Sequence, residues 1–340
     1  GHRGGRGEAI ENTLPAFAWG LIDGVTTLEL DNGISKAKLY YLDGVVIVWH
    51  DEEITPDKCT DTIPVVASDP IFPYVGKHIA NLTLAQIKTL DCGSKRLSAY
   101  PLQLIYPGTK LSTLDELFDF AHCVDPKRVI EWNIESKINP VDINSTRGVN
   151  DFVTAQHKAF LNSGYPLSQI TYQSFDWRTL IAMKALDKRI PTSALIDDTT
   201  IYGPSNTTSQ WQAGLVIDSF EGATSGEKVA NAAAYIKAQV LSTAAVSSQG
   251  NATDPADPGY VPFTTKAMID QAHKNGVLVK PWTADRLNIV SQLLDWGADG
   301  IISDYPTNVR RQVQQSGKAV APKFEEKAVL ACLNKHLQKV

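Results

Sequence analysis

The sequence predicts an α/β protein of the (β/α)8 TIM-barrel class, and three observations lead to this prediction. Between residues 113 and 303, stretches with apolar residues at helical spacing alternate with short apolar stretches typical of buried strands. Together with a strand at 25–31 and one expected before His2, they give the eight strands of this barrel. A doubly wound open sheet has the same alternation and is the alternative, but no G-x-G-x-x-G fingerprint follows a strand.

A helix and a strand follow the polar N-terminal residues. Leu14–Ile22 has apolar residues at helical spacing, and Asn12 or Thr13 is the expected N-cap. Residues 25–31 alternate between polar and apolar side chains, which predicts a strand with one face in the core.

A hairpin and a long insertion come next. The Asp43-Gly44 turn signal predicts that the first strand pairs with a second β-rich stretch at 45–51, so that His50 lies near the end of the first strand. Residues 52–110 are rich in Pro, Asp, Thr and Gly, with one short helix at 84–90. This composition predicts a loop-rich insertion rather than a core unit of the barrel.

The rest of the chain predicts a regular succession of elements. Helices are expected at 113–123, 150–162, 177–186, 226–238, 265–275 and 285–296, and strands at 129–135, 170–175, 192–196, 239–242, 277–281 and 300–303. We therefore expect one barrel domain over residues 1–317, with the insertion 52–110 inside it, and a C-terminal helical tail at 318–340.

Composition and charge argue against two classes of function. The 340 residues are 43% hydrophobic and 20% charged, which is an ordinary globular composition. The net charge of −5 is spread without long blocks of one sign, so a nucleic-acid partner has no support. No apolar run approaches the roughly 20 residues of a membrane-spanning helix, so we expect no transmembrane segment.

The cysteines and glycosylation sequons indicate a compartment. The four cysteines form no C-x-x-C pair, which argues against a thiolate zinc site, and a disulfide between Cys59 and Cys92 would staple the insertion. Because the chain begins on its first motif, with no room for the strand before His2, we also expect residues upstream. We expect a secreted glycoprotein because N-x-S/T sequons stand in polar or loop-like surroundings at Asn81, Asn144, Asn206 and Asn251.

The first fourteen residues have the composition of a phosphate site. They hold one histidine, two arginines and four glycines before the first helix. Glycines let backbone N–H groups approach an anion, and arginine offers a planar fork to phosphate oxygens. A flexible, solvated tail has the same composition, so this interpretation depends on partners elsewhere in the chain.

Acidic residues gather at the carboxyl ends of the predicted strands, where the active sites of such barrels lie. Glu29 and Asp31 are two residues apart and so share one face of their strand, and Glu135 ends a later strand. Three convergent carboxylates repel one another unless a cation or raised pKa values relieve them. Oxygen ligands suit one divalent cation, Mg²⁺ or Ca²⁺. The alternative is that Glu29 and Asp31 are surface residues of an edge strand.

Two histidines and two basic residues complete the candidate site. His2 and His50 stand at strand ends beside the carboxylates, where a pair can act as general acid and general base. Arg3 and Lys137 would neutralise a phosphate group. Together these residues indicate phosphodiester cleavage. A glycosidase would need two carboxylates without the basic residues, and the G-x-S-x-G nucleophile elbow is absent.

Several motifs stand in a definite order along residues 1 to about 309: His2-Arg3-Gly4, Glu11-Asn12-Thr13, Glu29-x-Asp31, His50-Asp51, Asn133-Ile134-Glu135-x-Lys137, Gln173-Ser174-Phe175, Trp282-Thr283 and the run 297–304. The series resembles that of the glycerophosphodiester phosphodiesterase family. Any one triplet would be weak evidence, whereas the ordered set is specific.

The resemblance implies a TIM barrel with a small insertion after its second strand, and hydrolysis of glycerophosphodiesters to sn-glycerol 3-phosphate and an alcohol. It implies a divalent metal on Glu29, Asp31 and Glu135, with His2 and His50 as the acid–base pair. It also implies that Arg3 and Lys137 hold the phosphate and that Glu11 and Asn12 orient the first loop. The sequons and cysteine positions are similar to those of secreted fungal members.

Two alternative functions remain open. A sphingomyelinase D-like phospholipase shares the barrel and the site but acts on lipids, and the Arg3-Gly4 and Glu11-Asn12-Thr13 elements favour the first family. A non-catalytic extracellular binding protein on the same barrel is the other alternative, although all five histidine and carboxylate positions are filled. Headgroup specificity is expected from the segments 199–228 and 247–263. Unless they are ordinary packing residues, the substrate-binding walls are the aromatic side chains Phe175, Trp211, Tyr260 and Trp282.

Overall fold

A computed structural model of the protein describes residues 1–37, 44–203 and 208–339. The chain divides into two compact units. The first comprises Gly1–Ile170, Asp304–Pro306 and Ala321–Val340, and the second comprises Thr171–Ser303 and Thr307–Val320. No helix in the described part of the chain is long and apolar enough to cross a membrane.

The first unit is built on β1, Thr27–Ile34, which is paired on both sides. The strand β2, Val46–Val48, runs antiparallel to β1 and confirms the predicted hairpin, although Asp43 of its turn lies outside the described residues. The strand β3, Glu131–Ser136, runs parallel to β1, with Asp31 directly opposite Glu135. This register places the acidic residues of the two strands at the same level.

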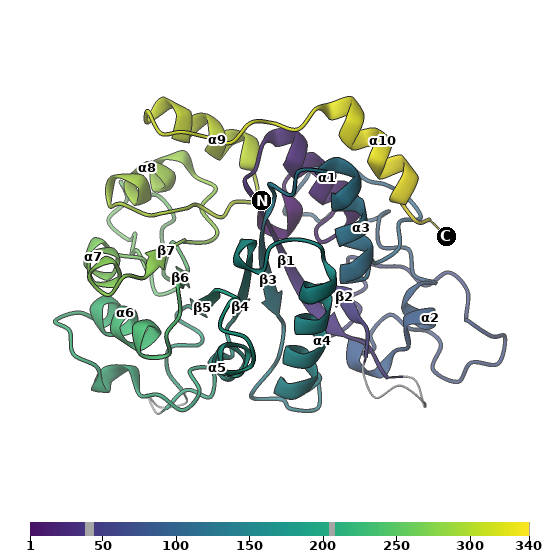
Figure 1. Ribbon diagram of the computed structural model, residues 1–340, viewed down its shortest axis with the longest axis horizontal. Helices are drawn as coiled ribbons and strands as arrows, with labels where there is room; N and C mark the ends of the chain where they lie inside the picture. The colour runs from purple at the N-terminus through teal and green to yellow at the C-terminus, as the bar shows by residue number, and fades with distance from the viewer. Residues whose placement is uncertain (38–43, 204–207, 340) are drawn as a thin grey trace. The chain divides into compact units, whose positions relative to one another are not determined.

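Three helices lie against this sheet and a fourth packs on two of them. They are α1, Leu14–Asp23; α3, Leu114–Val124; α4, Val149–Asn162; and α10, Glu326–His336. The hydroxyl of Thr13 caps α1 by accepting a hydrogen bond from the Ala16 N–H, so of the two expected N-caps Thr13 is the one observed. The helix α10 packs on α1 and α3 (Figure 1), and the Cys123–Cys332 disulfide ties it to the end of α3.

The N-terminal loop lies directly against α1. Residues His2–Gly4 form a single 3-10 turn, and Gly4 has a φ of +91°. A Cβ atom on Gly4 would lie 2.8 Å from the backbone carbon of Ala16, so only glycine fits there. Arg3 and Asn12 also have positive φ angles, of 51° and 55°, which shows how tightly this loop is folded.

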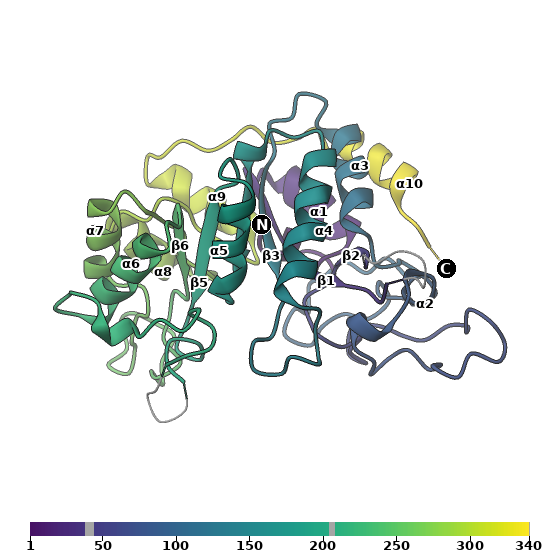
Figure 2. The same ribbon diagram turned by 60° about the horizontal axis from the view of Figure 1, so that its bottom comes forward.

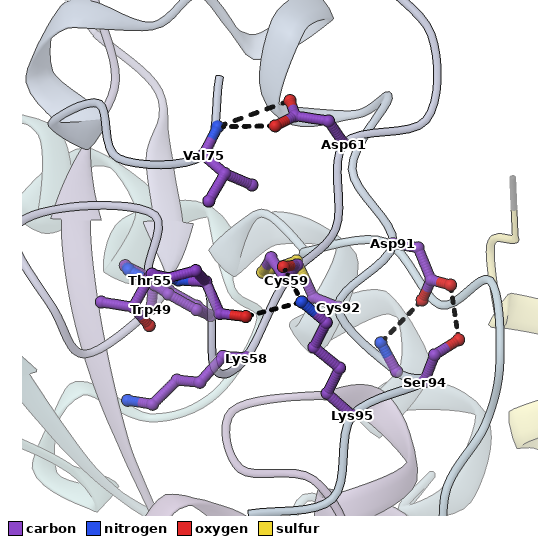
Figure 3. The surroundings of a disulfide bond; sticks show 12 residues. Trp49, Thr55, Lys58, Cys59, Asp61, Val75, Asp91, Cys92, Ser94 and Lys95 are labelled. Carbon is purple, nitrogen blue, oxygen red and sulfur yellow. Dashed lines mark hydrogen bonds between the residues drawn. A yellow bond between two sulfur atoms is a disulfide. The ribbon is translucent and has the colours of Figure 1, made fainter. Parts of the chain in front are cut away.

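The insertion after β2 has little regular structure, as its composition predicts. Between residues 52 and 110 the structure has one short helix, α2, Leu84–Ile87, and one 3-10 turn, Ile79–Asn81. The insertion nevertheless contributes to a small hydrophobic core, in which Ile54, Tyr74, Leu82 and Leu90 pack together with Ile47 of β2. The predicted Cys59–Cys92 disulfide is present at its centre (Figure 3).

The second unit continues the alternation of strands and helices. Its parallel strands follow the order β4, Ile170–Ser174; β5, Thr192–Ile196; β6, Val240–Thr243; and β7, Leu278–Val279. Its helices are α5, Trp177–Leu186; α6, Ser225–Tyr235; α7, Lys266–Lys274; α8, Leu287–Asp295; and α9, Pro306–Gln315, most of which lies in this unit. The helices α6 and α7 lie side by side in both views (Figures 1 and 2).

Two predictions at the end of the alternation are corrected. Residues 300–303 do not form a strand, although Ile302 N–H donates to the Pro281 carbonyl beside β7. The physical reason is that β7 has only two ladder residues, so little paired edge is available to the next segment. The helix α9, which follows, was not predicted, because its polar sequence has no apolar stripe of the expected width.

Candidate active site

Three carboxylates meet at the centre of the first unit. Glu29 and Asp31 come from β1 and Glu135 comes from β3, where the register of the two strands sets them side by side. One oxygen of each lies within 4.8 Å of the others, and all three residues are at most 4% exposed. The structure therefore brings together the predicted metal ligands, and it rules out the alternative that Glu29 and Asp31 are surface residues.

The burial of three carboxylates close together is electrostatically unfavourable. Burial, together with the charge of Asp31, raises the pKa of Glu29 to about 8. Burial also raises the pKa of Glu135 to about 7, even though Lys137 acts in the opposite direction. Burial alone would raise the pKa of Asp31 too, but Lys137 and Arg3 lower it well below its ordinary value. A cation among these oxygens would keep all three ionised.

The two predicted phosphate-binding residues lie against the same carboxylates. Lys137 Nζ is 2.8 Å from Glu135 Oε1 and 3.3 Å from Asp31 Oδ1. Arg3 Nε is 3.2 Å from Asp31 Oδ2, and the backbone N–H of Arg3 donates to Glu29 Oε2 at 2.7 Å. Both side chains are thus fixed at the edge of the carboxylate cluster.

Glu11 and Asn12 connect the first loop to the cluster, where the sequence placed them. Asn12 Nδ2 donates to Asp31 Oδ2 at 2.8 Å, and Asn12 Oδ1 accepts from the Asp31 backbone N–H. Glu11 Oε1 accepts from Arg3 Nη1 at 2.9 Å and is 2.8 Å from Lys58 Nζ. These contacts hold the loop close to Asp31.

His2 lies between Asp304 and the carboxylate cluster. Its Nδ1 is 2.6 Å from Asp304 Oδ1, and its Nε2 is 3.9 Å from Glu29 Oε2. The contact with Asp304 assigns the ring proton to Nδ1 and leaves Nε2 on the side of the cluster. Burial lowers the pKa of His2, although Asp304 opposes this effect, so the ring is neutral near pH 7.

His50 is held in the same way by a second carboxylate. Its Nδ1 is 2.7 Å from Asp51 Oδ1, and Asp51 Oδ2 is 2.5 Å from Lys58 Nζ. Burial, with help from the positive charge of Lys137, lowers the pKa of His50 to about 4. Each of the two histidines therefore has Nδ1 fixed on a carboxylate.

Charge balance across this network is incomplete. Among the described residues of the first unit, contacts link six carboxylates with four permanent cations, so two negative charges would remain with all six carboxylates ionised and both histidines neutral. Without a cation, protons on Glu29 and Glu135, whose pKa values are raised, offset this excess. The carboxylates are Glu11, Glu29, Asp31, Asp51, Glu135 and Asp304, and the cations are Arg3, Arg6, Lys58 and Lys137. One divalent cation has the charge that balances the network, which agrees with an all-oxygen set of ligands.

Sequence reasoning missed several members of the network. Asp304 closes the motif run 297–304, and Arg6 is one of the two arginines of the first loop, but the sequence assigns neither of them a role in the site. Arg6 Nε donates to Asp304 Oδ1 at 2.8 Å. Lys58 and Tyr100 come from the insertion, where no periodicity or motif indicates which side chains fold back onto the site.

The four aromatic residues predicted as substrate-binding walls, Phe175, Trp211, Tyr260 and Trp282, belong to the second unit. The rings of Phe175 and Trp282 are 5.5 Å apart and nearly perpendicular, and Trp211 lies 6.2 Å from Phe175. The indole N–H of Trp282 donates to the Ser242 carbonyl. Their role as walls of a substrate site stays a prediction.

Comparison with known proteins places these residues in a family. Residues 2–308 match the model of the Glycerophosphoryl diester phosphodiesterase family. A glycerophosphodiester phosphodiesterase of Bacillus subtilis is 26% identical over 310 residues, which cover 90% of this chain and 82% of that protein. One from Caldanaerobacter subterraneus is 24% identical, with 93% of this chain and 97% of that protein covered.

Solved structures confirm the fold class. A crystal structure from Silicibacter pomeroyi aligns with a TM-score of 0.70 at 24% identity and covers 94% of both chains. A phosphodiesterase of Oleispira antarctica, solved with its product sn-glycerol-3-phosphate, aligns with a TM-score of 0.59 at 18% identity, covering 92% of this chain and 95% of that one. At these identities the likeness shows the fold alone, which is the (β/α)8 barrel that the sequence predicts.

Proposed function

Because this chain belongs to the glycerophosphoryl diester phosphodiesterase family, we propose that it hydrolyses glycerophosphodiesters to sn-glycerol 3-phosphate and an alcohol with the help of one divalent cation. The observation that carries the proposal is the meeting of Glu29, Asp31 and Glu135 at one buried place, with His2 beside them. Burying three carboxylates together is electrostatically unfavourable, and a binding protein that had lost this activity would have no need of such a cluster.

The chain's own residues fit a divalent cation. Glu29, Asp31 and Glu135 each offer an oxygen, the raised pKa values of the two glutamates indicate a place that favours added positive charge, and the network lacks two such charges. Bound there, Mg²⁺ or Ca²⁺ would polarise a phosphate oxygen and offset the charge that develops during cleavage. Oxygen-only ligands favour either ion over zinc.

The remaining residues bind the phosphate and move protons. Arg3 and Lys137 carry the positive charges that hold the phosphate beside the carboxylates. One histidine, neutral with its proton on Nδ1, accepts the proton of the attacking hydroxyl through Nε2. The other acts as the imidazolium, which the negative charge of the bound phosphate favours, and donates its Nε2 proton to the oxygen of the departing alcohol. If the attacking hydroxyl belongs to water, sn-glycerol 3-phosphate forms directly. If it belongs to the neighbouring carbon of the glycerol, a cyclic phosphate forms, which water then opens to the same product. Asp304 and Asp51 keep His2 and His50 in the required tautomer.

Product analysis tests the proposal. The protein is incubated with glycerophosphocholine, glycerophosphoinositol, sphingomyelin and lysophosphatidylcholine, in Mg²⁺, in Ca²⁺ or in excess chelator. We expect sn-glycerol 3-phosphate from the first two substrates and no turnover in chelator. Preference for the two lipids would favour the sphingomyelinase D-like alternative, and tight substrate binding without product would favour a binding protein.

A matched pair of variants accompanies this experiment. Glu135→Gln removes one proposed ligand, whereas Glu131→Gln changes an exposed glutamate at the start of the same strand. We expect loss of turnover in the first variant and wild-type turnover in the second. Equal turnover in both would contradict the metal-ligand role of Glu135.

We further propose that the protein works outside the cell as a glycoprotein. Its four cysteines form two disulfides, Cys59–Cys92 and Cys123–Cys332, which persist in oxidising compartments. Of the predicted glycan sites, Asn81, Asn144 and Asn251 are exposed, and Asn206 lies outside the described residues. The relatives named above are bacterial, so a fungal origin stays a prediction. The division into a barrel at 1–317 and a tail at 318–340 also stays a prediction. A mass shift on enzymatic removal of glycans from the secreted protein tests the glycoprotein assignment.

A further inference from the structure

We propose that Tyr100, in the insertion, is a positioning residue that fixes the orientation of His2 by holding Asp304. The inference rests on the proposed function, because it concerns the histidine to which that function gives a proton-transfer role. It extends the site beyond the motif residues, since Tyr100 lies in a loop-rich segment far along the chain from both Asp304 and His2.

The carboxylate of Asp304 is held at both of its oxygens. Its Oδ1 is 2.6 Å from His2 Nδ1 and accepts a hydrogen bond from Arg6 Nε at 2.8 Å. Its Oδ2 accepts a hydrogen bond from the hydroxyl of Tyr100 at 2.7 Å. Asp304 is 1% exposed, so water does not replace a lost partner easily. The carboxylate can rotate only by breaking one of these bonds.

The insertion holds Tyr100 in place through its neighbours. The side chain of Gln103 donates to the Arg6 carbonyl at 2.5 Å, and the Leu104 N–H donates to the Glu8 carbonyl at 2.7 Å. The ring of Tyr100 lies 4.9 Å from the guanidinium carbon of Arg6, as a cation–π contact. The segment is therefore fastened to the N-terminal loop that carries His2, and Tyr100 reaches Asp304 from a fixed position.

This arrangement predicts an effect on the chemical step rather than on binding. Without the Tyr100 hydroxyl, Oδ2 of Asp304 loses this hydrogen bond and the carboxylate is held through Oδ1 by His2 and Arg6, so it can turn more easily, which loosens the plane of the His2 ring. The groups proposed to bind the phosphate, Arg3 and Lys137, are held by Asp31 and Glu135 rather than through Asp304, so they should stay in place. Misplacement of a proton-transfer group lowers kcat, whereas substrate affinity is retained.

The test compares Tyr100→Phe with Tyr106→Phe on glycerophosphocholine. Tyr106 is a matched control because its hydroxyl also makes a hydrogen bond, accepting from Trp19 Nε1 at 2.8 Å, but has no link to Asp304. We expect a roughly tenfold lower kcat with unchanged KM in Tyr100→Phe. We expect wild-type kinetics in Tyr106→Phe. Thermal unfolding of both variants checks that each is folded.

A double-mutant cycle shows whether Tyr100 acts through Asp304. In the Asp304→Asn background, Tyr100→Phe should change kcat by less than twofold, because the coupling has already been lost. The NMR signal of the His2 Nδ1 proton gives a reading that does not depend on turnover, and it should broaden or disappear in Tyr100→Phe but persist in Tyr106→Phe.

The outcomes separate this inference from the proposed function. If the wild type turns over glycerophosphocholine but Tyr100→Phe matches Tyr106→Phe in kcat and in the NMR signal, only the positioning role is overturned. Additive effects in the cycle also overturn it. If the wild type forms no product in Mg²⁺ or Ca²⁺, the proposed function fails, and a loss of the His2 signal in Tyr100→Phe would still support the positioning contact itself.

Discussion

Glu29 and Glu135 bear the largest electrostatic cost in the site, because both are buried and both face Asp31. Asp31 itself is stabilised by Lys137 and Arg3, whereas burial raises the pKa values of the two glutamates. Residues of this kind reduce the stability of the protein in the absence of their ligand. The cluster therefore lowers the stability of the metal-free protein and attracts a cation.

Replacing Glu29 tests whether the cluster lowers the stability of the metal-free protein. In chelator and at a pH above about 8, where Glu29 is ionised, Glu29→Gln should raise the free energy of unfolding by about 1 kcal/mol, since it removes one buried negative charge from the cluster. Addition of Mg²⁺ or Ca²⁺ should stabilise the wild type but not this variant. Thermal unfolding with and without the ion measures both effects. A variant less stable than the wild type in chelator would contradict this interpretation.

The two histidines allow a second prediction. His2→Ala and His50→Ala should each lower kcat by roughly 100-fold or more and leave the fold intact, because they remove a proton-transfer group. His273→Ala is the control, since His273 also pairs with a carboxylate, Asp299 at 2.9 Å, but is 39% exposed in the second unit. Steady-state kinetics and circular dichroism check the three variants. Normal turnover in either active-site variant would remove that histidine from the mechanism.

The residues of the site were predictable to the extent that strand geometry places them. Glu29 and Asp31 share a face because side chains alternate along β1, and Glu135 follows from the next parallel strand. The contacts of Asp304 with His2 and with Tyr100 were not predictable, because hydrogen bonds between residues that are 200 or more apart leave no local pattern.

Among the elements, the insertion contributes more to the site than its composition indicates. Lys58 precedes Cys59 of the disulfide and links Asp51 with Glu11, while Lys95 Nζ donates to the Cys59 carbonyl (Figure 3). The disulfide thus holds the backbone next to Lys58, which in turn holds the partner of His50.

Removal of the two disulfides should have different consequences for activity. The double change Cys59→Ser with Cys92→Ser should destabilise the protein by roughly 3–4 kcal/mol and lower kcat severalfold through Lys58. The double change Cys123→Ser with Cys332→Ser should destabilise it by roughly 4–5 kcal/mol and leave kcat unchanged. Denaturant unfolding and kinetics at low temperature separate the two effects. Equal kcat in both variants would show that the insertion does not support the site.

Element boundaries followed from the sequence wherever an amphipathic pattern was complete. The predicted ranges of α5 and β5 match the observed ones, and α4 begins one residue earlier than expected. The strand at 300–303 failed because formation of a strand depends on the length of its neighbour, β7, which the sequence of the segment itself does not contain.

At the scale of the whole molecule, the covalent links are consistent with an extracellular protein. The Cys123–Cys332 disulfide joins residues separated by 209 positions, so it connects α3 with the C-terminal helix across most of the chain. The sequence did not predict this pair, since the distance between its cysteines along the chain gives no indication of their approach in the barrel.

A thiol titration checks the covalent structure. In the denatured, unreduced protein a thiol reagent should label fewer than one cysteine per chain, because all four cysteines are paired. After reduction it should label four. Two reactive thiols before reduction would show that one of the disulfides does not form.

The barrel itself was predictable because alternation of strands and helices is a property of the whole chain and does not depend on any single element being predicted correctly.

The central claim is that one divalent cation at Glu29, Asp31 and Glu135 supports phosphodiester cleavage. The most direct measurement is the release of sn-glycerol 3-phosphate from glycerophosphocholine by protein treated with chelator, before and after Mg²⁺ or Ca²⁺ is restored. We expect no product before and full turnover after. Full turnover in excess chelator would contradict the account.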